Sequence, residues 1–346
     1  MSENRTFFRD TVDRILADTL DKADIDAAEE HRRLPGPLYE ALVENGITLM
    51  LVPEDQGGIG ASVGDATVIL RAAGEAAAPG PLLETMLGQL LLAKAGLDLA
   101  DGLLSLVFVD DLAVPVDGLL TDAALHDVPW PEAVAQVLVV ARTADGARLL
   151  VTQAGDWTVT PVPDAAGEPR DSLTAASIAV TAAAVGDYDE LLRTAAILRG
   201  AQILGGIEWS FRRSVEYAGE RKQFGREISK FQAVQQMLAE LADHVLASAS
   251  ITEAAAEGLN GSLVAAARSR LGDAVDATIT ITHQVHGAMG FSLEYALNSR
   301  TRRLMAWRDD YGSVLYWRRA LAGNFAGLTR ETFWPAVSDA GLPTAA

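Results

Sequence analysis

The hydrophobic periodicity of the chain changes twice, and these changes limit the folds that it can adopt. From about residue 5 to 98, apolar residues recur every three or four positions, as in "DATVILRAAGEAAA", which is typical of amphipathic helices. Between about 102 and 182, short β-like runs such as "LLSLVFV" and "AQVLVVARTA" replace this pattern, with turn sequences such as "ADG" between them. From about 187 onward the helical spacing returns. The sequence therefore predicts helices, then strands, then helices again.

A chain of 346 residues, 49% of them hydrophobic, is long enough for several packed units with a large core. We expect an N-terminal helical domain over residues 1–101 and a small middle β domain over 102–186. About six or seven short strands fit the middle domain, as one compact sheet or barrel. Long amphipathic segments over residues 187–346 predict an antiparallel four-helix bundle. The predicted fold class is mainly α with a central β domain.

Composition and charge exclude several kinds of site and partner. The absence of cysteine excludes disulfides, thiolate metal sites and a cysteine nucleophile. His283 and His286 have a helical spacing, but no acid cluster adjoins them, so we expect packing or capping there and no metal site. A net charge of −19 argues against nucleic acids and anionic membranes as partners. Without a long apolar run or a typical leader, the sequence predicts a cytoplasmic protein without membrane insertion.

The junction between two long helical segments reads "YAGERKQFGREISKFQAVQQMLAELA" and begins at residue 217. Gly225 is expected to end the first helix beside Arg221, Lys222 and Arg226, and Phe231 to open the next helix. Cations would meet free backbone N–H groups there, which suits a phosphate or pyrophosphate. Capping of a helix C-terminus by these cations is the alternative that the residues leave open.

These residues resemble the signature of the acyl-CoA dehydrogenases: a tyrosine, three residues, Arg-Lys-x-Phe-Gly, and then Phe-Gln-Ala-Val-Gln. Three further segments are similar to family segments in the same order, namely "GITLMLVPEDQGGIG", "APGPLLE" and "HQVHGAMGF". The resemblance covers most of the chain and implies the family's helix–sheet–helix fold. It also implies FAD as cofactor, an acyl-CoA substrate and an oligomer, either homomeric or heteromeric, arranged as a dimer of dimers.

The resemblance assigns cofactor contacts to individual residues. Arg221 and Phe224 match the residues that contact FAD bound to a neighbouring subunit, and Gln232 matches a glutamine near its adenosine. Gln284 and Gly287 match the segment that approaches the same dinucleotide, where a small residue lets the backbone come close. The family's acidic Gly-Ser loop in the middle domain is missing. Trp130 is the nearest stand-in for its tryptophan segment, with a core tryptophan as the alternative.

In the reaction that the resemblance implies, a carboxylate removes the α-proton of an acyl thioester and the β-hydrogen leaves as hydride to FAD. The segment "RRLMAWRDDYGS" matches the family's base segment without a gap. Tyr311 then falls on the catalytic glutamate and Gly312 on its glycine. Ser313 falls on the threonine of the family's segment, so the resemblance implies that it contacts the cofactor. The other known base position falls on Ala195, so neither position has a carboxylate.

Three explanations for the missing base stay open. Asp310, one residue earlier, could move into the base position as the catalytic residue. A partner subunit could carry the base instead, as in bacterial relatives that act on bulky steroid-like thioesters. The chain could also be a related flavoprotein, such as a flavin monooxygenase, or an inactive member. A helical scaffold without flavin is a different class. The resemblance further implies an electron-transfer flavoprotein as electron acceptor and a role in fatty acid or steroid degradation.

Two charged features near the C-terminus have simpler interpretations. Adjacent acids such as Asp309 and Asp310 in a polar segment are typical of surface charge. Six nearby arginines are expected to form ion pairs on helix surfaces or between subunits: Arg300, Arg302, Arg303, Arg308, Arg318 and Arg319.

Overall fold

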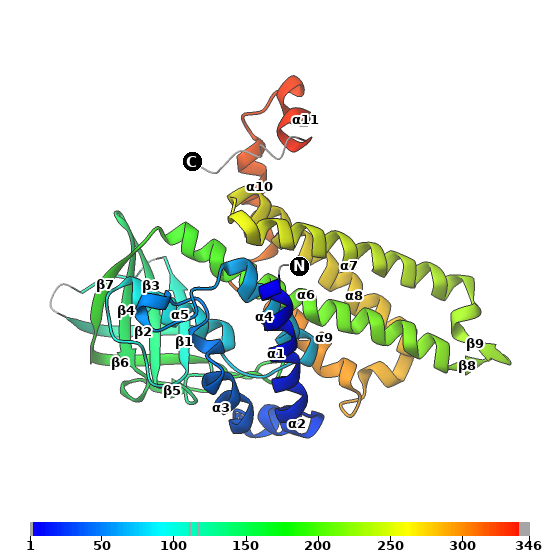
Figure 1. The fold of residues 1–346 in the computed structure, drawn as a ribbon, viewed down its shortest axis with the longest axis horizontal. Coiled ribbons are helices and arrows are strands. Elements are labelled where there is room, and N and C mark those ends of the chain that lie inside the picture. The colour runs from blue at the N-terminus through cyan, green and yellow to red at the C-terminus, as the bar shows by residue number, and fades with distance from the viewer. Residues whose placement is uncertain (1–2, 111, 116–117, 339–346) are drawn as a thin grey trace. The chain divides into compact units, whose positions relative to one another are not determined.

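The computed structural model describes residues 3–110, 112–115 and 118–338. It divides into two compact units: unit 1 comprises Met1–Ile69 and Ala78–Ala195, and unit 2 comprises Leu70–Ala77 and Ala196–Ala346. Figure 1 draws the elements with the labels used below. Helices α4 (Val63–Ala76) and α6 (Tyr188–Glu220) contribute residues to both units. The division into three domains at residues 101 and 186 stays a prediction.

The remaining helices of unit 1 precede its strands. Their bounds are α1 Glu3–Thr19, α2 Lys22–His31, α3 Gly36–Glu44 and α5 Leu82–Lys94, with 3-10 turns at Ile47–Leu49 and Glu54–Gln56. Asp21 begins α2 with a capping box, because its side chain accepts from the Asp24 N–H and the Asp24 side chain accepts from the Asp21 N–H. Nearly all of α5 is buried, so it is an interior helix.

The strands of unit 1 form two sheets, whereas the sequence predicts one compact sheet or a barrel. The first sheet has the order β1-β3-β4-β7, with β1 Leu104–Val109, β3 Gln136–Thr143, β4 Gly146–Gln153 and β7 Thr181–Gly186. The second has the order β2-β6-β5, with β2 Leu119–Pro129, β6 Arg170–Ala179 and β5 Thr158–Thr160. Apolar residues from both sheets share one core cluster. The apolar runs do not predict β2, because Asp122, His126 and Asp127 interrupt its hydrophobic residues.

Unit 2 is a helical bundle. Its further elements are the hairpin strands β8 Lys222–Gln223 and β9 Arg226–Glu227, the 3-10 turns Ile228–Lys230 and Gly287–Phe291, and the helices α7 Gln232–Gly258, α8 Gly261–His286, α9 Ala296–Trp307, α10 Val314–Phe325 and α11 Arg330–Ser338. The long helices α6, α7 and α8 lie side by side in Figure 1, and residues of all three share a buried apolar cluster with α9. The predicted fold class is therefore confirmed. A turn at residues 308–313 separates α9 from α10.

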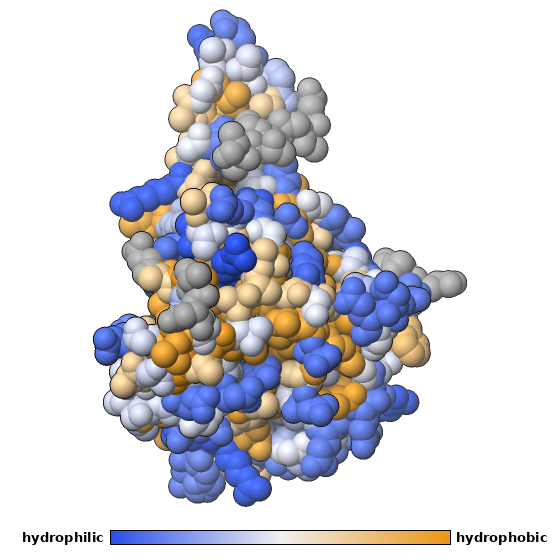
Figure 2. Space-filling view, turned by 90° about the vertical axis from the view of Figure 1, so that its left-hand side faces the viewer, coloured by the Kyte–Doolittle hydropathy of each residue, from blue (hydrophilic) through white to orange (hydrophobic). Residues whose placement is uncertain are grey.

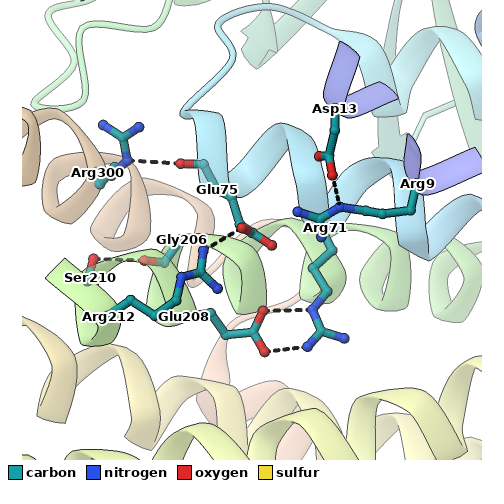
Figure 3. Close-up of polar contacts among 9 residues, drawn as sticks. All are labelled: Arg9, Asp13, Arg71, Glu75, Gly206, Glu208, Ser210, Arg212 and Arg300. Atoms are coloured by element: carbon teal, nitrogen blue, oxygen red, sulfur yellow. Dashed lines mark hydrogen bonds and ion pairs between the residues drawn. The ribbon is translucent and has the colours of Figure 1, made fainter. Parts of the chain in front are cut away.

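Within unit 2, the end of α4 packs against α6 with almost no space between the backbones. A Cβ atom on Gly74 would lie 1.9 Å from the Gln202 carbonyl oxygen, and one on Gly205 would lie 1.9 Å from that of Arg71. The Arg71 guanidinium also holds the Glu208 carboxylate through two nitrogens, with Nε 2.7 Å from Oε2 (Figure 3). Glycine is needed at both contacts, since any side chain would push the helices apart.

Two of the C-terminal arginines are buried, so their expected place on a helix surface is wrong. Arg300 Nε donates to the Glu75 carbonyl oxygen at 3.0 Å, as Figure 3 shows, and its guanidinium lies 3.8 Å from the centre of the Trp209 ring. Arg303 donates to the Ala77 carbonyl oxygen. Burial, together with the charge of Arg303, lowers the pKa of Arg300 to about 9. Both arginines cap the carbonyl groups at the C-terminal end of α4, which have no partner within that helix.

The surface of the described residues combines hydrophilic and hydrophobic areas. On the face drawn in Figure 2, hydrophobic residues gather in the middle and hydrophilic residues surround them. Among the described residues, no helix is long and apolar enough to cross a membrane. Large apolar side chains that are exposed in unit 2 include Phe224, Phe291, Leu293 and Trp334.

Candidate functional site

The junction after α6 forms a β-hairpin, not the helix end that the sequence predicts at Gly225. Helix α6 already ends at Glu220, and β8 and β9 pair through a two-residue turn made of Phe224 and Gly225. Both turn residues have left-handed backbones, with φ of 51° and 79°, which a two-residue hairpin requires. The Phe224 side chain is 92% exposed. The hairpin, residues 221–227, thus exposes the Phe224 side chain to solvent. The left-handed backbone at this position is unfavourable for any residue other than glycine.

Three cations of the hairpin form no salt bridge with the described acidic residues. Arg221, Lys222 and Arg226 are exposed. Among the described residues, none of the three makes a salt bridge, although the chain has 47 acidic residues. The Arg226 guanidinium instead lies 4.3 Å from the centre of the Phe231 ring. Cations that are not neutralised within the chain can bind an external anion.

Helix α7 follows the hairpin after the 3-10 turn Ile228–Lys230, and its N-terminus has no side-chain cap. Phe231 occupies the N-cap and offers no side-chain hydrogen bond, and the exposed Gln232 is the first helical residue. The first N–H groups of a helix point at any anion placed there, and the helix dipole stabilises its charge. Together with the hairpin cations, this end of α7 has the donors that the pyrophosphate of FAD needs. The residues present therefore fit that part of the cofactor.

Gln284 lines a groove of about 450 Å³ near the C-terminal end of α8. His283 and Phe291 line the same groove, and their rings lie 4.3 Å apart. Burial lowers the pKa of His283, so this histidine is neutral at pH 7. Gly287 follows the groove as the C-cap of α8, with φ of 58° and open space where a side chain would lie. A ligand can therefore approach the backbone at this position.

His286 joins the end of α8 to the end of α6. Its ring stacks on the Tyr217 ring with 4.4 Å between centroids, and its Nδ1 lies 2.8 Å from the Thr282 carbonyl oxygen. Burial lowers the pKa of His286, while the hydrogen bond to Thr282 opposes this shift. Among the residues that the structure describes, no group of three or more His, Cys, Asp or Glu side chains could hold a metal ion. His286 has the packing role that its sequence context suggests.

The second candidate region is the α9–α10 turn, residues 308–313, where the predicted surface location of Asp310 is wrong. Asp309 is exposed, but Asp310 is buried and its Oδ2 lies 3.0 Å from Arg199 Nε. Arg199 is itself 3% exposed. A buried carboxylate requires such a partner, because burying an unpaired charge is costly.

Arg268 fixes the backbone of the same turn. It is fully buried and donates through Nη2 to the carbonyl oxygens of Arg308 and Asp310, at 2.9 and 2.7 Å. Burial lowers the pKa of Arg268 to about 10, and the Asp310 carboxylate opposes this shift. At neutral pH the turn is therefore held by two buried cations and one buried anion. Sequence reasoning missed Arg199 and Arg268, since both lie in helices far from the turn along the chain.

Tyr311, Gly312 and Ser313 complete the turn. Tyr311 has a left-handed backbone with φ of 54°, and the Arg199 guanidinium lies 5.8 Å from the centre of its ring. The Ser313 hydroxyl accepts from the Tyr316 N–H at 3.1 Å and caps α10. The structure therefore brings Asp310, Tyr311 and Ser313 together in this turn.

The predicted cofactor residues other than Ser313 lie elsewhere in unit 2. Arg221, Phe224 and Gln232 lie on the hairpin and the start of α7, and Gln284 and Gly287 lie at the end of α8. These two ends share one apolar cluster, in which side chains of α8 pack with residues at the start of α7. In unit 1, Trp130 is buried at the end of β2, as expected of a core tryptophan.

Two models of one protein family match the chain. The N-terminal domain of the acyl-CoA dehydrogenases matches residues 2–98, and the C-terminal domain of the same family matches residues 188–309. Acyl-CoA dehydrogenase IpdE2 of Mycolicibacterium smegmatis is 28% identical over 308 residues, which cover 88% of this chain and 93% of the relative. Acyl-CoA dehydrogenase FadE34 of Mycobacterium tuberculosis is 32% identical over 320 residues, which cover 88% of this chain but 44% of the relative.

Solved structures share the fold over nearly the whole chain. The ChsE4-ChsE5 complex from Mycobacterium tuberculosis has a TM-score of 0.85 at 23% identity and covers 95% of this chain and 99% of that chain. The Tcur3481-Tcur3483 steroid ACAD has a TM-score of 0.83 at 21% identity and covers 94% and 98%. At these identities, the likeness establishes the architecture.

Proposed function

Because the chain belongs to the acyl-CoA dehydrogenase family, we propose that it is one subunit of a heteromeric enzyme whose partner subunit carries the catalytic base. The chain is an oxidoreductase of this family with FAD as its cofactor. The proposed reaction removes two hydrogens across the α–β bond of an acyl-CoA thioester. The observation that supports a partner most directly is the buried ion pair between Asp310 and Arg199.

The described residues favour no side chain of this chain as the base. Tyr311 occupies the glutamate position, and a phenol with an ordinary pKa near 10 removes an α-proton poorly at neutral pH. Ala195, at the alternative position, has no ionisable group. Asp310 would have to leave Arg199, and removing the carboxylate from a buried arginine costs about 3–5 kcal/mol. A base on another chain avoids this cost.

The cofactor contacts are proposed for the hairpin and the ends of α7 and α8. Arg221 would hold the pyrophosphate by charge, Phe224 would cover part of the dinucleotide, and Gln232 would lie near the adenosine. Gln284 would hydrogen-bond to the dinucleotide from its groove, and Gly287 would let the backbone come close. FAD, when bound, accepts the β-hydrogen as hydride. The assignment of Ser313 as a cofactor contact has the least support, since its hydroxyl already caps α10.

The relatives support an assembly of unlike chains. More than half of FadE34 lies outside the match, which leaves room for a second chain of this size in the same polypeptide. The ChsE4-ChsE5 and Tcur3481-Tcur3483 structures are each named for two components, the latter a steroid ACAD. We therefore propose a dimer of dimers, a bulky thioester such as a steroid side-chain thioester as substrate, and an electron-transfer flavoprotein as acceptor. A cytoplasmic location stays a prediction.

Three alternatives predict different experimental results. A self-sufficient dehydrogenase would use Asp310 as its base, and a flavin monooxygenase of the same fold would need oxygen instead of an electron-transfer flavoprotein. A flavin-free scaffold would leave the unpaired hairpin cations without a ligand. The buried Asp310–Arg199 pair disfavours the first alternative, and membership of the family disfavours the scaffold.

The proposal is tested by purifying the tagged chain alone and together with the protein that co-purifies from its own cells. We expect bound flavin and acyl-CoA dehydrogenation only in the complex, with Arg221→Ala lowering the flavin content. Asp310→Asn should leave the rate of the folded complex nearly unchanged. Turnover by the chain alone, lost about a thousandfold in Asp310→Asn, would make Asp310 the base and overturn the partner hypothesis.

A further inference from the structure

Phe231 is a fixed platform for two side chains of the hairpin. It packs into the apolar cluster around Ile228 and Leu241. The Phe224 ring meets Phe231 edge-on with 6.2 Å between centroids, and the Arg226 guanidinium lies 4.3 Å from the centre of the Phe231 ring. Because Phe231 is also the N-cap of α7, this stacking holds the Arg226 charge at the start of that helix.

Arg226 has an aromatic partner but, unlike Arg142, no carboxylate partner among the described residues. Arg142 pairs with Asp110 and Asp189 at 2.7 and 2.8 Å, whereas among the described residues Arg226 makes no ion pair. A guanidinium that lies over an aromatic ring can still donate through its N–H groups to a phosphate. The stacking also reduces the entropy that the side chain would lose on binding.

We propose that Arg226 is a second phosphate-binding residue for the FAD dinucleotide beside Arg221, and that Phe231 is its positioning residue; this rests on the proposed function. Arg221 comes before the turn of the hairpin and Arg226 comes after it. The two guanidinium groups can therefore bind the pyrophosphate from the two strands of one hairpin. Arg226 makes a charge-assisted contact, so its contribution weakens as salt increases.

The experiment measures FAD binding to the deflavinated complex by the change in flavin fluorescence, at low and high salt. Arg226→Ala should weaken binding about tenfold at low salt and less at high salt. Arg226→Lys, which keeps the charge but not the planar stacking, should fall between wild type and Arg226→Ala. Phe231→Leu should weaken binding a few-fold although Arg226 is present. The matched control, Arg319→Ala at another exposed arginine, should bind FAD as wild type.

The outcomes separate this inference from the proposed function. If Arg221→Ala weakens FAD binding and Arg226→Ala does not, the inference is wrong and the cofactor site stands. If neither variant changes binding, both are wrong. A loss in Arg226→Ala that is the same at both salt concentrations, or that accompanies a lower melting temperature of the FAD-free complex, also overturns the phosphate contact.

Discussion

The hairpin and the α9–α10 turn share one backbone conformation and differ in their surroundings. Each contains an aromatic residue with a left-handed backbone followed by a left-handed glycine. The φ angles are 51° and 79° for Phe224 and Gly225, and 54° and 110° for Tyr311 and Gly312. A left-handed backbone costs a residue other than glycine about 1–2 kcal/mol. The surrounding structure must therefore hold both aromatic residues in place.

The charges around the two turns are arranged in opposite ways. The hairpin cations are exposed and, among the described residues, make no ion pairs. In the α9–α10 turn, Arg199 and Arg268 are buried, one against the Asp310 carboxylate and the other against backbone carbonyl groups. The cations of the hairpin are thus available to an external anion, whereas those of the α9–α10 turn are already bound within the chain. The two turns share a backbone conformation and differ in the charges around them.

The largest expected effect is that of breaking the ion pair in the α9–α10 turn. Asp310→Ala leaves Arg199 buried without its carboxylate and should lower the free energy of unfolding by about 3–5 kcal/mol. Glu227→Ala removes the partner of Lys230, an exposed pair 3.7 Å apart, and should cost less than about 1 kcal/mol. Denaturant unfolding of both variants measures the difference. Equal losses would show that the pair at Asp310 is not stabilised by burial.

The second, smaller effect compares the cost in stability of replacing Gly312 and Gly225 with alanine. Gly312→Ala places a Cβ 2.7 Å from Trp317 Nε1 and 2.9 Å from Tyr316 Cδ1, so strain and overpacking should together cost about 3 kcal/mol. At Gly225 no atom lies within 4 Å of the added Cβ, and the strain alone should cost about 1 kcal/mol. Thermal unfolding of the two alanine variants compares them. A loss at Gly225 as large as that at Gly312 would contradict the view that the hairpin is open.

Periodicity predicts the long helices well because their buried faces follow a regular spacing. In α6, Leu191, Ala195 and Leu198 follow each other at spacings of four and three residues, and all three are buried. The division of the strands into two sheets is not visible in the sequence, because a strand's sheet depends on pairing with distant residues. Strand β2 is hard to predict for a local reason as well, since a register shift occurs between Leu125 and Val128.

Some residues of the candidate site can be predicted from the sequence and others cannot. Arg221 and Gln232 belong to a continuous segment, so a family signature can identify them from the sequence. The burial of Asp310 cannot be seen there, because its partner Arg199 lies on α6 and Arg268 lies on α8. Two adjacent aspartates look like surface charge until the fold encloses one of them. The base question therefore depends on tertiary contacts that the segment itself does not contain.

The smallest expected effect is a pH dependence at the hairpin end of the bundle. Burial lowers the pKa of His286 below the value of about 6.5 expected in the unfolded chain. Well above pH 6.5, this residue is neutral in both the folded and the unfolded chain. As the pH falls further, the unfolded chain binds the proton first, and stability should fall by at most about 1.4 kcal/mol per pH unit. His286→Phe, which keeps an aromatic ring next to Tyr217, should reduce this slope in denaturant unfolding between pH 7 and 5.

Hydrogen exchange can locate this effect in the molecule. Acid should loosen the end of α8 and the adjoining hairpin before the α9–α10 turn, because the pKa of about 10 for Arg268 keeps its charge constant over this range. After correction for intrinsic rates, amides at the C-terminal end of α8 should lose protection at pH 5, while amides of residues 308–313 should not. Replacing the exposed His31 with Gln is the control and should leave this pattern unchanged. If residues 308–313 lost protection first, the α9–α10 turn would be less stable in acid than the end of α8. That result would contradict the view that buried charges stabilise the turn over this pH range.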